Sequence, residues 1–182
     1  MINKIKKNII FFLVKLLPST RCYQLKSRLL NSISGFQVSS SKIVSSVQFI
    51  GEGKIKIGMG SFIGHHTKLL TGKSSIIIED NVDISSNVLF INGTHELNDL
   101  SEQPDRIAGK GKSNDIKVKR GAWIGASSTI LGGVTVGEYS IVAAGSIVIN
   151  DVPPRVIVAG NPATIKKLWS DEYNSWIKNK RF

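Results

Sequence analysis

Aliphatic residues recur at every sixth position over much of this sequence, and that period limits the folds open to it. The fourth residue after each aliphatic is small or β-branched, as in Ala122 and Ser128. The longest run consists of Val118, Ile124, Ile130, Val136, Val142 and Val148. Shorter blocks with the same period come earlier: Ile43, Phe49 and Ile55; Ile57, Ile63 and Leu69; Ile78, Ile84 and Phe90.

A period of six fits a short strand followed by a turn, whereas an α-helix would scatter these residues around its surface. Three such units close a triangular coil of about 18 residues, and strands of successive coils pair as neighbours in a parallel sheet. One coil cannot bury its apolar face alone, so several must stack. We therefore predict an all-β, parallel β-helix over residues 35–164, with the aliphatics inside. The period does not determine its handedness.

The period is interrupted twice in the middle of the chain. Between Leu69 and Ile78 the count is off by three, which predicts extra loop residues near Thr71–Ser74. Between Phe90 and Val118 lies a polar stretch rich in glycine and charge, residues 96–115. Long loops in compact domains are usually functional, so we predict an extruded loop that serves the site.

The first 51 residues carry eight Lys or Arg and no Asp or Glu. We predict one or two amphipathic helices within residues 1–34, broken near Pro18. The apolar run Ile9–Leu17 is short, because a membrane-spanning helix needs about 20 apolar residues. Two interpretations stay open: contact of residues 2–30 with an anionic membrane surface, or packing on the domain or a neighbouring subunit. No zinc finger, recognition helix or RNA-binding signature indicates nucleic acid.

The C-terminal end departs from the repeat. Asp151–Pro154 stops the strand pattern, and Gly160–Ala163 forms a turn. The apolar residues beyond it have helical spacing, which predicts a C-terminal helix over residues 165–182 that braces the prism: Ile165, Leu168, Trp169, Tyr173, Trp176 and Ile177.

Three features together resemble the hexapeptide-repeat acetyltransferases, in particular the maltose, galactoside, nodulation-type and polysaccharide O-acetyltransferases. They are the six-residue blocks, the Thr94-His95 pair before a long loop, and the Gly160-Asn161-Pro162-Ala163 ending. The resemblance covers Ile43 to Leu168. It implies a left-handed parallel β-helix, a homotrimer with each active site between two subunits, and acetyl-CoA as the donor.

The sequence contains three histidines, and imidazole is the natural base near neutral pH. The resemblance implies that His95 is the general base, which takes the proton of the acceptor hydroxyl. It places His65 where some relatives have an acceptor-contacting Asn, and we assign Asn92, in the turn before His95, to the acceptor as well. The group that orients the His95 ring stays open among a backbone carbonyl, Asp80, Asp83 and Glu96.

The resemblance also assigns the donor site. Contacts to the CoA arm, largely through the backbone, fall on Ala126, Ala144, Ile149 and Asn150. Gly125 would let the arm approach closely, and Trp123 would line the groove. Relatives hold the CoA phosphates with two arginines at the positions of Thr164 and Lys167. Thr164 weakens that contact, and Lys167 lacks the bidentate geometry of arginine.

Together these features predict an acetyl-CoA-dependent O-acetyltransferase acting on a sugar or polysaccharide hydroxyl, with no metal needed for the chemistry. The alternatives are an N-acetyltransferase acting on an amino-sugar nucleotide and a non-catalytic β-helix scaffold. A γ-type carbonic anhydrase needs three zinc-binding histidines, and no histidine follows His95. With Cys22 as the single cysteine, we expect a cytoplasmic protein, with peripheral contact at the inner face of the cytoplasmic membrane as an option.

Overall fold

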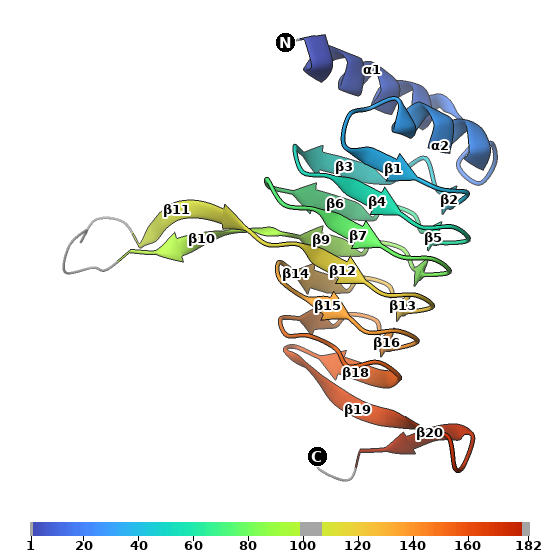
Figure 1. The fold of residues 1–182 in the computed structure, drawn as a ribbon, viewed down its shortest axis with the longest axis vertical. Helices are drawn as coiled ribbons and strands as arrows, with labels where there is room; N and C mark the ends of the chain where they lie inside the picture. Colours follow the sequence, from blue (N-terminus) through green and yellow to red (C-terminus); the bar gives the residue numbers. More distant parts are fainter. Residues whose placement is uncertain (1, 99–106, 180–182) are drawn as a thin grey trace.

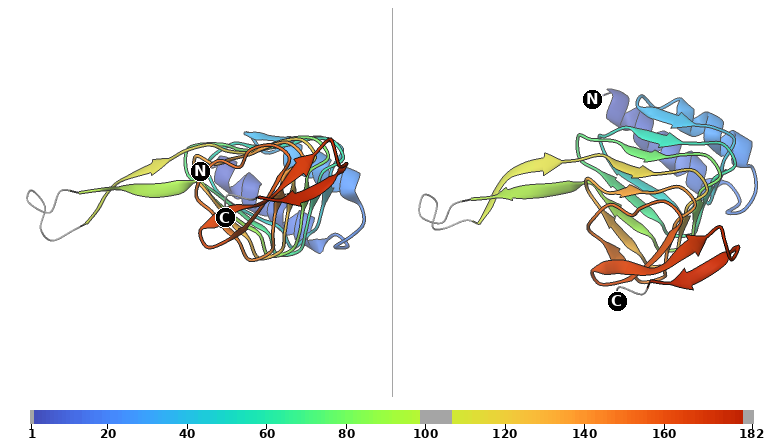
Figure 2. Two further views of the ribbon diagram at one scale, coloured as in Figure 1. Left: turned by 90° about the horizontal axis from the view of Figure 1, so that it is seen from below. Right: turned by 60° about the horizontal axis from the view of Figure 1, so that its bottom comes forward.

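The computed structural model describes residues 2–98 and 107–179. Stacked coils form a triangular prism with two helices at one end, a hairpin at the other and an arm projecting from its side (Figures 1 and 2). The predicted fold class is confirmed: this is a left-handed parallel β-helix of about six turns.

Each of the three faces of the prism is a parallel sheet. The first face holds β1 (Phe36–Val38), β4 (Ile55–Ile57), β7 (Ile76–Ile78), β12 (Ile116–Val118) and β15 (Thr135–Val136). The second holds β2 (Lys42–Ile43), β5 (Phe62–Ile63), β8 (Asp83–Ile84), β13 (Trp123–Ile124), β16 (Ile141–Val142) and β18 (Val156–Gly160). The third holds β3 (Gln48–Gly51), β6 (Lys68–Thr71), β9 (Leu89–Ile91), β14 (Thr129–Leu131) and β17 (Ile147–Val148).

The repeated aliphatics fill the prism, as the period predicted. Ile63, Ile84, Ile124 and Val142 pair in register down the second face, and all four are fully buried. The small residues of the repeat close the corners. The buried Ser128 hydroxyl, for example, donates to the Ala143 carbonyl at 3.1 Å. This hydrogen bond joins the corners of two successive coils, while the aliphatics exclude water from the axis.

The predicted N-terminal helices are α1 (Ile2–Leu16) and α2 (Tyr23–Asn31). Helix α1 closes the first coil with its buried Ile10 and Val14. Phe11 packs on Phe36 and Phe49, with ring centroids 6.0 Å and 5.9 Å away. No helix of the described residues is long and apolar enough to cross a membrane.

The interruption after β9 is the arm. Strands β10 (Gly93–Leu97) and β11 (Ala108–Ser113) form an antiparallel pair that leaves the prism between β9 and β12 (Figure 1). The predicted extruded loop, residues 96–115, is thus largely the outer part of a two-stranded ribbon. Its residues 99–106 lie outside the described part.

The predicted C-terminal helix is wrong over the described residues. The chain instead forms β19 (Ala163–Ser170) and β20 (Ser175–Lys178), which extend the second face by antiparallel pairing beyond β18. The last strand of a parallel stack leaves an open edge, and β19 fills it. Trp169 and Trp176 pair directly across the hairpin, with ring centroids 5.3 Å apart. Two residues that pair across a short hairpin can have the same separation in the sequence as two residues on one side of a helix, so the apolar spacing alone fits both structures.

Candidate active site

The residues predicted for the site lie on two different edges of the prism. The 2–3 edge, where the second face turns into the third, contains the corners at His65, Ser86, Ala126 and Ala144. These corners stack directly, because the Ser127 N–H donates to the Ser86 carbonyl and the Gly145 N–H to the Ala126 carbonyl. The 3–1 edge, where the third face turns into the first, carries the arm.

His95 lies on the exposed face of β10, and its ring is held by the other strand of the arm. Its Nδ1 is 3.0 Å from the carbonyl oxygen of Gly109. A carbonyl can only accept, so Nδ1 is the protonated nitrogen of the pair. In the neutral ring, Nε2 is then left with a free lone pair. This is the tautomer that a general base requires, and its orienting group is one of the candidates left open by the sequence.

The position directly opposite His95 on β11 carries no side chain. Gly111 pairs directly with His95, and a Cβ built there would meet nothing within 4 Å. The basic residues of β11, Lys110 and Lys112, alternate with these glycines. Lys112 pairs with Thr94, the residue before His95, so its side chain points to the side opposite to His95. The imidazole therefore stands beside open space on its own side of the arm.

The base of the arm is fixed to the neighbouring coil. Ser113 Oγ accepts the N–H groups of Lys73 and Ser74, each at 3.1 Å. The Ser74 hydroxyl donates to the Ser113 carbonyl at 2.8 Å. The extra loop predicted between Leu69 and Ile78 is thus the anchor of the arm, a role that the sequence did not reveal.

Asn92 belongs to this anchor, which corrects its assignment to the acceptor. The side chain is fully buried. Its Oδ1 accepts the Gly72 N–H at 2.6 Å, and its Nδ2 donates to the Ser74 carbonyl at 2.9 Å. Both ends of the amide are used inside the protein, so Asn92 positions the arm and does not face a substrate.

The 2–3 edge offers backbone donors beside small side chains. Within the described part of the chain, the N–H groups of Ala126 and Ala144 donate to no protein group. Ala144 is exposed and Ala126 half-buried, and a Cβ added at Gly145 would meet nothing within 4 Å. Backbone N–H groups of this kind, beside small side chains, suit the carbonyl groups of a thin polar chain such as the CoA arm.

Gly125 has a different role from the predicted one. It is buried, and a Cβ there would lie 2.5 Å from the Ala144 nitrogen and 2.8 Å from the Val142 carbonyl oxygen. The glycine is required because two coils stack closely at this point, not because a ligand approaches it. Trp123 on the adjacent face is 49% exposed, and its Nε1 donates to Ser85 Oγ at 3.2 Å.

The remaining donor residues are divided between the edges. Thr164 and Lys167 lie exposed on β19, and Thr164 pairs with Ala159 at the lower end of the 2–3 edge. Ile149 and Asn150 follow β17 on the 3–1 edge, which is the edge of His95. Within a single chain, one group of predicted residues therefore lies on or beside the 2–3 edge: Trp123, Ala126, Ala144 and Thr164. The other group is on the 3–1 edge: His95, Ile149 and Asn150.

Other polar residues considered for the site are used elsewhere in the chain. His65 is half-buried near the upper end of the 2–3 edge, with Nδ1 3.4 Å from Ser46 Oγ. Asp80 Oδ1 accepts the Met59 N–H on the edge between the first and second faces. Asp83 lies on the outside of the second face, beside Trp123.

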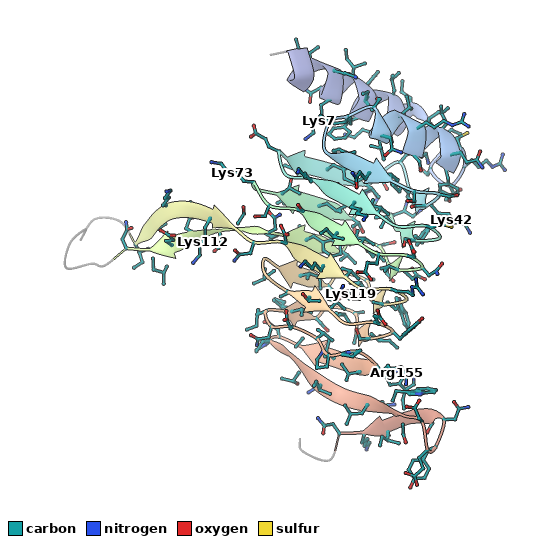
Figure 3. The ribbon with its side chains drawn as sticks, in the orientation of Figure 1. Lys7, Lys42, Lys73, Lys112, Lys119 and Arg155 are labelled. Atoms are coloured by element: carbon teal, nitrogen blue, oxygen red, sulfur yellow. The ribbon has the colours of Figure 1, made fainter. Side chains whose placement is uncertain are left out.

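Two basic residues on the edge between the first and second faces are ion-paired. Figure 3 shows both, Lys119 and Arg155, on the body of the prism; Lys119 contacts Glu79 at 2.8 Å and Arg155 contacts Asp171 at 2.9 Å. Partial burial raises the pKa of Glu79, but hydrogen bonds from the Lys119 ammonium and the Arg120 N–H outweigh it and hold the pKa below its ordinary value.

The strands of the third face have two outward positions in each coil. One forms a mixed column of Gln48, Lys68, Leu89, Thr129 and Ile147, and the other is apolar in every coil. We name the second column the outward apolar column. Its members Ile50, Leu70, Ile91 and Leu131 pair in register, and Ile149 continues it directly after β17, where the third face meets the 3–1 edge. Ile50 and Ile149 are 48% and 47% exposed. The matching positions of the first face are mostly polar: Gln37, Lys56, Ile77, Lys117 and Thr135. The third face lies between the two edges that carry the site.

Comparison with known proteins places the chain in a family. Residues 115–150 match the profile described as bacterial transferase hexapeptide (six repeats). A Staphylococcus aureus (strain MRSA252) protein named as an acetyltransferase is 30% identical over 146 residues, which cover 79% of this chain and 71% of that one. A Saccharomyces cerevisiae protein, also named as an acetyltransferase, is 33% identical over 111 residues, covering 61% and 54%. The crystal structure of a hexapeptide-repeat acetyltransferase from Vibrio cholerae, in complex with acetyl-CoA, is 26% identical with a TM-score of 0.75, covering 93% and 88%.

The chain therefore belongs to the hexapeptide-repeat transferase family, as its resemblance indicated. It spans about half the length of the yeast relative, and between 24% and 43% of the length of the serine acetyltransferases that it also matches.

Proposed function

We propose that the chain is an acetyl-CoA-dependent O-acetyltransferase that modifies a hydroxyl of a sugar or polysaccharide. The observation that carries the proposal is the setting of His95. Its ring is oriented by the Gly109 carbonyl, its Nε2 makes no hydrogen bond within the described residues, and Gly111, directly opposite, carries no side chain. Deprotonation of a hydroxyl near neutral pH needs a base of this kind with room for the acceptor.

The reaction follows from this geometry. Nε2 of His95 takes the proton from the acceptor hydroxyl while its oxygen bonds to the thioester carbonyl carbon. The carbon–sulfur bond then breaks, and the imidazolium returns the proton to the CoA sulfur. The Gly109 carbonyl keeps the proton on Nδ1 throughout and stabilises the positive ring.

We place the CoA arm along the 2–3 edge. The free N–H groups of Ala126 and Ala144 would bind its amide carbonyls, and Lys166 and Lys167 on β19 would approach its phosphates as point charges. Backbone N–H groups of this edge are also the candidate donors to the oxygen that becomes negative during transfer. We further propose a cytoplasmic location, because that is where acetyl-CoA is available.

We propose that the working unit is a homotrimer. The outward apolar column is an exposed hydrophobic surface of the kind that subunit contacts bury. If the threefold axis is parallel to the long axis of the prism, each residue lies at the same height along that axis in all three subunits. The arm leaves between β9 and β12 (Figure 1), so it would reach the neighbour's 2–3 edge near Ser86 and Ala126. His95 would then lie between His65 on the acceptor side and Ala126 on the donor side.

The test separates binding from chemistry. Acetyl-CoA binding is measured by calorimetry and thermal shift on wild type, His95→Ala and the adjacent arm variant Glu96→Ala. A ligand at about 100 times its Kd stabilises the fold by about 2.7 kcal/mol. All three proteins should bind one acetyl-CoA per subunit. Release of free CoA thiol with a panel of sugars should fall by about 10²- to 10⁴-fold only in His95→Ala.

Failure of all three proteins to bind acetyl-CoA would leave a non-catalytic scaffold as the better account. Transfer to amino-sugar nucleotides but to no hydroxyl would make the chain an N-acetyltransferase with the same base.

A further inference from the structure

Helix α1 has a second apolar face that its own chain does not cover. Four large side chains follow each other at intervals of four, three and four residues, which places them on one side of a helix. Their exposed fractions are 53%, 55%, 60% and 66%, in the order Ile5, Ile9, Phe12 and Leu16. Leu13, beside them, is 42% exposed. We name these five residues the α1 apolar stripe.

The stripe is not the side that holds α1 on the prism. The helix packs through Ile10 and Val14, which are 6% and 5% exposed, and through Phe11. At 3.6 residues per turn, these residues lie on the opposite side from the stripe. An ordinary surface helix has one apolar side and one polar side, so a second apolar side indicates a second contact.

Positive charges border the stripe, and no negative charge is near it in the sequence. Lys6 and Lys15 lie on α1 at its two borders, and Arg21 and Arg28 are exposed on the following segment. No Asp or Glu precedes Glu52. Lys7 is separate from this group, because its Nζ donates to the Gly51 carbonyl at 2.5 Å.

We propose that α1 docks on an anionic lipid bilayer, with the stripe in the interface and Lys6 and Lys15 at the headgroups. An apolar face bordered by basic residues is the pattern of interfacial helices. Long lysine side chains reach the headgroups while their stems stay in apolar surroundings. Nothing in this step depends on the acetyltransferase activity.

The same charges disfavour a second copy of α1 as the occupant. Paired helices place the residues that border their apolar seam against each other, and stable pairs have opposite charges there. Two copies of α1 would bring Lys6 and Lys15 together with the same residues and no carboxylate to balance them. An anionic bilayer supplies the missing negative charge.

The two helices lie together at one end of the prism (Figure 1). In the proposed trimer, all three α1 helices would be at the same end and bind one bilayer together. Multivalent attachment raises apparent affinity without any new contact.

The experiment is co-sedimentation of the full chain with phosphatidylcholine vesicles with and without phosphatidylglycerol. The stripe variant carries Ile9→Gln, Phe12→Gln and Leu16→Gln, since glutamine keeps the helix propensity. The control variant carries Met59→Gln, Tyr139→Gln and Tyr173→Gln, which remove equally exposed large side chains elsewhere. A charge variant carries Lys6→Gln and Lys15→Gln.

Wild type should partition onto anionic vesicles and not onto neutral ones, and the stripe variant should lose at least about tenfold of that partitioning. The control variant should match wild type, and both the charge variant and high salt should weaken binding several-fold. Wild type that ignores anionic vesicles overturns the proposal. A stripe variant that binds anionic vesicles as well as wild type also overturns the proposal. The same holds if the only change in the stripe variant is a smaller oligomer in solution. Circular dichroism spectra and thermal unfolding like those of wild type show that each variant is folded.

Discussion

At the scale of residues, the surroundings of His95 depend on a missing side chain as much as on those present. Gly111 lies directly opposite His95, and residues directly opposite in an antiparallel pair point to the same side. We expect Gly111→Val to fill the space beside the imidazole without disturbing the fold, because a Cβ there meets nothing. Acceptor turnover (kcat/KM) should fall by about tenfold or more, while acetyl-CoA binding stays unchanged.

Lys112→Val is the matched control for that variant, since it adds the same side chain to the next position on the other side of β11. Equal losses in both variants would mean that the arm tolerates no change, and that the cleared space has no special role.

Glu79 provides a pH-dependent contribution to stability. Its folded-state pKa lies below the ordinary value, so its carboxylate stabilises the fold above that value, and the effect is lost as pH falls through the folded-state pKa. The Glu79 and Lys119 side chains are about one-third exposed, which limits the contribution to less than about 1 kcal/mol. Urea unfolding should show Glu79→Gln less stable than wild type at neutral pH and equal to it in acid. A difference that persists in acid would indicate a packing effect.

Single residues of the site were predicted unevenly from the sequence. His95 was assigned as the base through the resemblance, from its place after Thr94 and before the long loop, and its role stays a prediction. The group that orients its ring was left open, because the Gly109 carbonyl is 14 residues away and meets the ring only through the register of β10 and β11. Asn92 and Gly125 were assigned to ligands because a sequence position on a loop does not distinguish a side chain facing the ligand from one supporting the coil.

At the scale of elements, the arm depends on a buried anchor. In Asn92→Ala, the Gly72 N–H and the Ser74 carbonyl would lose their partners in a buried setting. Leaving such groups unsatisfied costs about 1–3 kcal/mol. We expect a loss of this size in the free energy of unfolding, together with lower activity as the arm loses its position. The exposed Asn150→Ala should show no comparable loss of stability.

The repeated strands of the coils were predictable from the sequence, whereas the C-terminal hairpin of β19 and β20 was missed. Six-residue spacing has a single structural explanation when it continues over many blocks, so the coils and their buried aliphatics followed directly. The last element had only six apolar positions as evidence, and these fit a helix as well as a hairpin. The open edge of β18 decides between the two, and that edge exists only after the prism has formed.

At the scale of the whole molecule, the outward apolar column should decide the oligomeric state. Leu131→Asp places a charge in the middle of the third face, where burial in a subunit contact would be costly. We expect sedimentation to show a trimer for wild type and monomers for this variant, with activity lost although His95 is intact. Ile77→Asp makes the same change at an outward position of the first face and should remain trimeric. A trimeric Leu131→Asp would place the interface elsewhere.

The division of the site between two edges leads to a test that a single-chain active site would fail. His95→Ala removes the base, and Ala144→Trp adds a bulky side chain at an exposed position of the proposed donor edge, so each variant alone should be inactive. In trimers reassembled from equal amounts of both, an active site needs the arm of an Ala144→Trp subunit against the 2–3 edge of a His95→Ala subunit. About a quarter of the sites in a cyclic trimer meet that condition by chance, so about a quarter of the wild-type activity should return. Hybrid trimers that form without regaining activity would show that base and donor edge act within one chain.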